Sequence, residues 1–172
     1  MTSVTVTSSA HGRLTTIPAS SADSLQLAQQ ITALIDGGGR ASAHTVTAST
    51  GSVAVDAADA RGTVVVHSAA ANILFIGGHS PATVFGGSGS DTLKAACGSV
   101  TLVVADGLRG QSTFDNFVHG LSKVSLIGYP ADEEIDAVAM QSHANGATTI
   151  SLSDGTKITF LYLAQLKVSD FI

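Results

Sequence analysis

The chain has 172 residues, which is long enough for one domain with a buried core. Eight Lys and Arg against 13 Asp and Glu give a formal net charge of −5, which excludes the basic surface that a nucleic-acid partner needs. No run approaches the roughly 18 apolar residues of a membrane span, so no membrane segment is expected. The single cysteine, Cys97, excludes an internal disulfide.

Residues 1–42 predict a short strand and a capping helix. The strand is expected over Val4–Thr7, where valines alternate with threonines. Ile17-Pro18 predicts a break, because proline disfavours a helical conformation at the preceding residue. A helix is expected to begin near Ser20 or Ser21 and to end before Gly37, and it would cover the apolar end of the following repeat. Its apolar face would carry Leu27, Ile31, Leu34 and Ile35. No cleavable signal peptide is expected, because the amino terminus has neither a basic region nor a long apolar run.

Residues 43–110 contain short apolar runs at a nearly constant spacing. Val55, Val65, Phe75 and Phe85 are ten residues apart, and the spacing continues at nine through Lys94 and Val103. Such a spacing leaves room for one short strand and one tight turn, which is the half-coil of a parallel β-solenoid. Turns are expected at places that include Ser68–Asn72, the repeat is expected to end after Gly107, and Phe75, Phe85 and Val103 are expected in the core.

Residues 111–172 predict an α+β cap. A strand is expected over Val124–Ile127, followed by a helix that opens at Pro130. Two apolar alternating runs flank Asp154-Gly155, which predicts a β-hairpin with a tight turn. The predicted fold is therefore mainly β: a short parallel β-solenoid or β-roll, capped by an amino-terminal amphipathic helix and by a carboxy-terminal α+β segment with a β-hairpin.

One turn and the tail resemble a known family. Gly86 to Lys94, with the sequence Gly-Gly-Ser-Gly-Ser-Asp-Thr-Leu-Lys, matches the glycine-rich nonapeptide of repeats-in-toxin (RTX) proteins at every defined position. The tail resembles the carboxy-terminal domain of bacterial type I secreted proteins at Phe114–Phe117, Lys123–Tyr129, Thr149–Phe160 and Val168–Ile172. The resemblance implies secretion through an uncleaved carboxy-terminal signal.

The resemblance also implies calcium as the cofactor. In RTX rolls, an aspartate and turn carbonyls of one loop bind calcium together with the loop one full coil away. The candidate ligands in this sequence are Asp91, the carbonyls of Gly87 and Gly89, and Asp106 from the next coil. Calcium takes about six to eight oxygen ligands, so these residues would make at most one partial site.

The neighbouring repeats lack the rest of a calcium motif. Ala82 and Val100 stand where the counterpart of Asp91 belongs in the adjacent half-turns. The alternative is that Asp91 caps its own turn through its side chain. In that case the repeat is retained for packing rather than for metal binding.

Other chemical groups are dispersed along the chain. The histidines lack the spacing of metal ligands and are expected in turns or on the surface: His11, His44, His67, His79, His119 and His143. A β-solenoid enzyme would need acidic and basic side chains on one groove, and the group available is Asp56, Asp59, Arg61, Asp106, Arg109 and Asp115. We interpret this group as solvated turn residues and predict no catalytic site.

The sequence favours a secreted, non-enzymatic structural or interaction protein, which assembles into filaments or belongs to a surface or biofilm matrix. Its expected partner is a second copy, with Val4–Thr7 as a strand donor; a cell-surface or matrix polysaccharide is the other partner considered. One alternative is a calcium-binding RTX-like module that folds on export. Another is a carbohydrate-active enzyme that uses Asp106 and Arg109.

Overall fold

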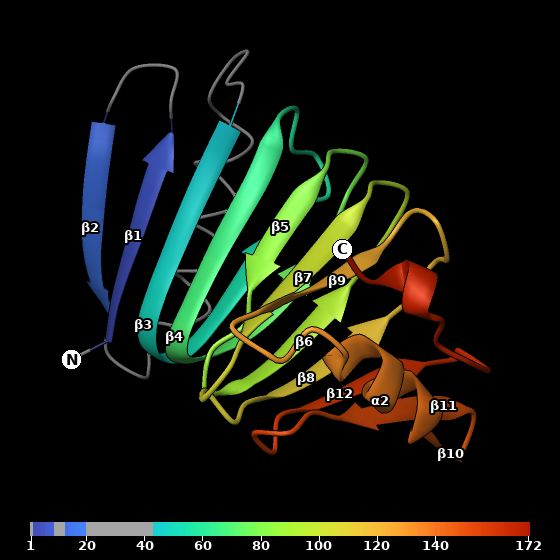
Figure 1. Ribbon diagram of the computed structural model, residues 1–172. Coiled ribbons are helices and arrows are strands. Elements are labelled where there is room, and N and C mark those ends of the chain that lie inside the picture. Colours follow the sequence, from blue (N-terminus) through green and yellow to red (C-terminus); the bar gives the residue numbers. More distant parts are fainter. Residues whose placement is uncertain (1, 9–12, 20–42) are drawn as a thin grey trace.

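The computed structural model describes residues 2–8, 13–19 and 43–172. The capping helix predicted after Ser21 lies outside the described residues. The three strands at the amino-terminal end of the sheet are β1 (Thr2–Ser8), β2 (Arg13–Ala19) and β3 (Ala43–Asp56) (Figure 1).

The predicted donor strand is β1, and it lies inside the sheet. β1 is antiparallel to β2 on one side, where Val4 faces Ile17, and to β3 on the other, where Val4 faces Ala48. Residues Val4–Thr7 therefore have strands of their own chain along both edges, and β2 is the outermost of the described strands at this end.

β2 continues through Pro18, where the sequence predicts a break. Proline has no backbone N–H and is disfavoured inside a sheet, but an edge strand tolerates it because one row of its backbone groups has no strand partner. The prediction of a break was therefore wrong because the position of the segment at the edge outweighs the local preference.

The parallel strands of the solenoid form two rows, one on each face, as Figure 1 shows. One row holds the first halves of β3 and β4 followed by β5, β7 and β9; the other holds their second halves followed by β6 and β8. The coil length is 18 residues from Val64 to Ala82 and again from Ala82 to Val100. The strands after β3 are β4 (Thr63–Ile76), β5 (Ala82–Phe85), β6 (Ser90–Lys94), β7 (Val100–Ala105), β8 (Gln111–Asp115) and β9 (Lys123–Ile127).

Two predictions about the repeat were wrong in detail. The turn expected at Ser68–Asn72 lies within β4, which continues as one strand from one face of the solenoid to the other. The stacking also continues past Gly107, because β8 pairs with β6 and β9 pairs with β7. The coil lengthens here, from 18 residues to 21 between Ser90 and Gln111, and this longer spacing hid the continuation.

The core fills the space between the two faces. Phe75 is fully buried, as predicted, but Phe85 is only half-buried and stacks on His67 with ring centroids 4.3 Å apart. Val103 is buried at 7% exposure, as predicted, but it pairs in register with Phe85 and lies outside the core cluster that contains Leu102 and Val104. Val84 beside Phe85 is the residue that points inward. A spacing of ten residues carries the chain from one face to the other without keeping the same side of the strand inward, so Phe75 and Phe85 are not equivalent.

The carboxy-terminal residues extend the same sheet. β12 pairs in parallel with β8, and the predicted hairpin is confirmed, with Ile150 opposite Ile158. The helix begins at Glu133 and not at Pro130, because residues 130–132 form a turn in which Glu133 N–H donates to the Pro130 carbonyl. The elements are α2 (Glu133–Ala139), β10 (Ser142–Ala144), β11 (Ala147–Ser151), β12 (Lys157–Leu161) and the 3-10 turn η1 (Val168–Asp170).

The predicted fold class is confirmed: the protein is mainly β and contains a β-solenoid of about four turns. Among the described residues, no helix has both the length and the apolar character required to traverse a bilayer.

Candidate functional site

The glycine-rich turn is a place of close approach between coils. A Cβ atom on Gly87 would contact the carbonyl oxygen of Ala69, and one on Gly89 would contact that of Ala71. Both carbonyls belong to the preceding coil, so these two positions need glycine for space. The same is true of glycines in other stacked turns, namely Gly78, Gly98 and Gly110.

Asp91 points into this turn and is only 2% exposed. Its Oδ1 accepts a hydrogen bond from the Ile73 N–H at 3.0 Å, and its Oδ2 accepts one from the Gly87 N–H at 3.2 Å. The Ser68 hydroxyl lies 3.4 Å from Oδ1. The carboxylate thus joins its own turn to the preceding coil.

Burial raises the pKa of the Asp91 carboxyl above its usual value of 3.8, although the hydrogen bonds from Ile73, Gly87 and Ser68 oppose the shift. Removing a carboxylate from water disfavours its charged form, whereas N–H donors favour that form. Because the pKa of Asp91 is raised overall, burial affects it more than the hydrogen bonds do.

Asp106 lies at the other candidate position, directly after β7. Asp106 is exposed. Its Cβ would lie 3.6 Å from a Cβ atom added to Gly128, so the two residues are neighbours. Burial raises the pKa of the neighbouring Tyr129 to about 12, and the negative charges of Asp154 and Asp106 contribute to that shift. Asp106 therefore lies beside the turn of the following coil.

The four candidate ligands do not fit a calcium site. Calcium requires oxygen ligands, but both oxygens of Asp91 face backbone N–H groups, whose hydrogens carry partial positive charge. The Gly89 carbonyl accepts a hydrogen bond from the Gln111 N–H at 3.0 Å, and the Gly87 carbonyl lies against Gly110. Within the described residues, no group of three or more His, Cys, Asp or Glu side chains is arranged to hold a metal ion.

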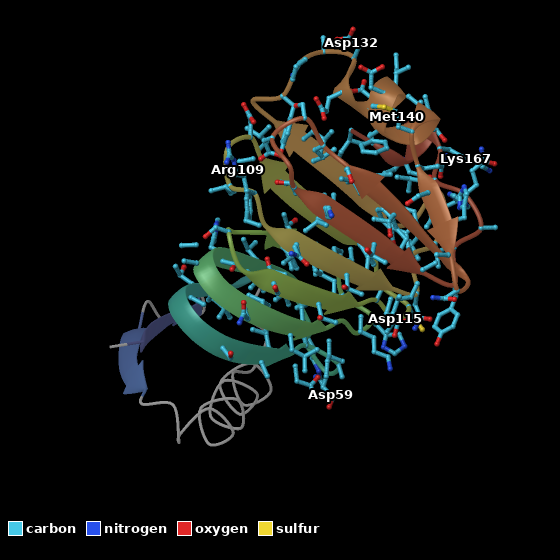
Figure 2. All side chains as sticks on the ribbon, turned by 90° about the horizontal axis from the view of Figure 1, so that it is seen from below. Asp59, Arg109, Asp115, Asp132, Met140 and Lys167 are labelled. Atoms are coloured by element: carbon cyan, nitrogen blue, oxygen red, sulfur yellow. The ribbon has the colours of Figure 1, made fainter. Side chains whose placement is uncertain are left out.

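The acidic and basic group considered for an enzyme is divided between two edges of the roll. Asp59 lies in the turn that follows β3, and Asp115 ends β8, so both belong to one edge. Asp106 and Arg109 lie between β7 and β8, at the opposite edge. Figure 2 shows Arg109 well apart from Asp59 and Asp115.

Sequence reasoning missed a hydrogen-bonding centre at Asp154. Its Oδ2 accepts from the N–H groups of Gly107, at 3.0 Å, and Arg109, at 3.3 Å, and its Oδ1 accepts from the Thr156 N–H at 2.8 Å. The sequence placed Asp154 correctly in a hairpin turn. Nothing in the pattern connects that turn to a loop 47 residues earlier.

Comparisons with known proteins show a similar fold. No protein-family model and no curated protein sequence matches this chain. Among solved structures, the extracellular lipase LipA from Serratia marcescens is similar, with a TM-score of 0.55 and 18% identity. The match covers 72% of this chain and 19% of the lipase chain, so this chain corresponds to a small part of the enzyme. At this identity the likeness shows the fold alone, and that fold fits the β-roll implied by the RTX-like turn.

Proposed function

We propose that this chain is a secreted, non-enzymatic β-solenoid that binds copies of itself end to end through the edges of its sheet. The fold it shares with part of an extracellular lipase supports a secreted location. Export through the carboxy-terminal tail rests on the resemblance of that tail to type I secreted proteins. A non-enzymatic role is supported by the separation of Asp59 and Asp115 from Asp106 and Arg109.

The observation that carries the proposal is the edge formed by β10. All three of its residues, Ser142 to Ala144, are exposed, and among the described strands β10 pairs only with β11. Natural edge strands are commonly protected by charged residues or proline. β10 contains neither, although it is only three residues long, and we propose that its outward backbone groups accept a further strand.

A hollow beside β10 supplies an apolar anchor for such a contact. It has a volume of about 520 Å³, and its lining includes His143, Ala144, Tyr162 and Leu163. Tyr162 is 85% exposed and adopts a left-handed backbone conformation with φ of 58°. Strained residues are often found at functional sites, and tyrosine combines a large apolar ring with a polar tip.

The opposite end of the sheet offers the second contact. Among the described strands, β2 is outermost there and pairs with β1 alone. Its Arg13 and Pro18 are of the kinds that protect an edge, so the residues available for pairing are those between them. Pairing β10 of one copy with β2 of the next joins two different surfaces, and contacts of this kind grow into filaments unless they close into a ring.

A charge on β10 tests the proposal. We expect Ala144→Lys to shift the protein toward monomer, because a lysine on an edge strand opposes pairing with another strand. The measurement is particle mass by light scattering, with electron microscopy of the same samples. Ala131→Lys is the matched control. It adds the same charge at an exposed position that lies outside any strand.

Two results would overturn self-association. One is a monomer for the unmodified protein at all concentrations. The other is assembly that occurs only when a matrix polysaccharide is added, which would make the polysaccharide the partner.

A further inference from the structure

Two side chains join consecutive coils at the glycine-rich turn by hydrogen bonds that run in opposite directions. Asn72 and Ile73 belong to one coil, and Ser90 and Asp91 hold the corresponding positions 18 residues later. Asn72 Oδ1 accepts the Ser90 N–H at 2.8 Å, and Asp91 Oδ1 accepts the Ile73 N–H at 3.0 Å. We refer to these four residues as the inter-coil clasp.

The clasp provides acceptors for two backbone N–H groups, that of Ile73 within β4 and that of Ser90 at the start of β6, where the chain passes from one face to the other. The second carboxylate oxygen of Asp91 binds the Gly87 N–H, so the same side chain also holds its own turn closed. Hydrogen bonds in which a carboxylate is the acceptor are stronger than those between neutral groups. One acidic side chain therefore fixes both the shape of its own turn and the distance of that turn from the preceding coil.

Among the described residues, the positions stacked on Asp91 in the two adjacent coils carry no second acidic group for a metal. Ile73 occupies its position on the preceding coil and is 2% exposed, and Ser112 occupies it on the following coil and is 7% exposed. The space beside Gly86 is bounded by the Asp91 carboxylate, Leu102 and the Ser112 hydroxyl. A calcium ion there would have to displace N–H donors and approach an apolar side chain.

We propose that this β-roll folds and remains folded without calcium, because the inter-coil clasp makes directly the connection between coils that the RTX resemblance assigns to a metal ion. The nonapeptide retains its aspartate as an acceptor for backbone amides. Its glycines are retained because the stacked turns leave no space for a side chain.

The experiment compares the full chain in a calcium chelator and in millimolar calcium chloride. We expect the same far-ultraviolet circular dichroism spectrum and the same melting temperature in both, and no heat of calcium binding in titration calorimetry. An unfolded spectrum in chelator that calcium restores, or a melting temperature that rises with calcium, would overturn the proposal.

Substitutions separate the clasp from a metal site. Asp91→Ala removes the acceptor of two backbone N–H groups, so we expect its melting temperature to fall equally with chelator and with calcium. If Asp91 were a calcium ligand, the loss would occur only in calcium. Asp106→Ala is the control, because no hydrogen bond of its carboxylate occurs among the described residues, and we expect no change in either condition. If Asp91→Ala does not fold, the comparison on the unmodified chain still decides the question.

Discussion

Asp154 shows how a single carboxylate connects segments that are distant in the sequence. Burial opposes its ionisation, but hydrogen bonds from Thr156 and from the Arg109 N–H outweigh burial and hold the pKa of Asp154 below its usual value of 3.8. A carboxyl group whose pKa is lower in the folded chain stabilises that fold when ionised. This stabilisation is fully present above the unfolded pKa and is lost as the pH falls through the folded pKa.

We expect Asp154→Asn to lower the free energy of unfolding at pH 7 by about 1 kcal/mol, because the charge-assisted part of these hydrogen bonds is lost. The difference from the unmodified chain should shrink at a pH below 3.8. Urea unfolding at both pH values measures it. Asp132→Asn is the control, since Asp132 makes no side-chain cap hydrogen bond to α2. An equal loss in both variants, or a difference independent of pH, would contradict this account.

At the scale of elements, the carboxy-terminal segment is held in place by a buried carboxylate. Asp170 is 1% exposed, and its Oδ2 lies 2.8 Å from His119 Nδ1 and 2.9 Å from the Lys167 N–H. The Ile172 N–H donates to the Val124 carbonyl at 3.0 Å, which places the end of the chain against β9. The contact between His119 and Asp170 thus fixes the position of η1.

We expect His119→Ala to lower the free energy of unfolding by about 1–3 kcal/mol, because it leaves a buried carboxylate without one of its partners. The amide of Ile172 should then exchange hydrogen faster than the amides of β8, and this local effect distinguishes a released tail from general destabilisation. Hydrogen exchange followed by mass spectrometry measures both. His79→Ala, at an exposed turn position, serves as control. Unchanged protection at Ile172 would show that the contact does not hold the segment.

The elements also show what a sequence of this kind reveals. Regular spacing predicted the stacked strands around Phe75, and a turn signal at Asp154-Gly155 predicted the hairpin, because both depend on residues close in sequence. The pairing of β12 with β8 was not predictable, since Ile158 and Ser112 are joined only by the folded topology. The candidate site was predicted only in part: the motif placed Asp91 directly after the glycine-rich turn, and it lies there, near the start of β6. Which atoms its carboxylate faces depends on the preceding coil.

At the scale of the whole molecule, stability depends on the distance between coils. Each coil rests on the one before it through backbone contacts, and the close approach at Gly87 sets that distance on one edge of the roll. Gly98 has the same role on the other edge, where its N–H donates to the Gly78 carbonyl at 2.7 Å. Each repeat of a solenoid contacts its neighbours, so a local increase in spacing weakens the joint between the two halves of the stack.

Gly87→Ala tests this account of the stack. The added methyl group would meet the Ala69 carbonyl of the preceding coil, and because that oxygen belongs to the backbone, the coils must separate locally. We expect a loss of about 3 kcal/mol in the free energy of unfolding, as for overpacking in a core. Urea denaturation gives the value, and Ser88→Ala, at the exposed neighbouring position of the same turn, is the control, because it removes only an exposed hydroxyl contact of 3.5 Å with the Ala69 carbonyl and adds no atom between the coils. Because the contact is between backbone and methyl group, the loss should be the same in chelator and in calcium. Equal stability of the Gly87 and Ser88 variants would mean that the coils have space to spare and that glycine is not needed for stacking.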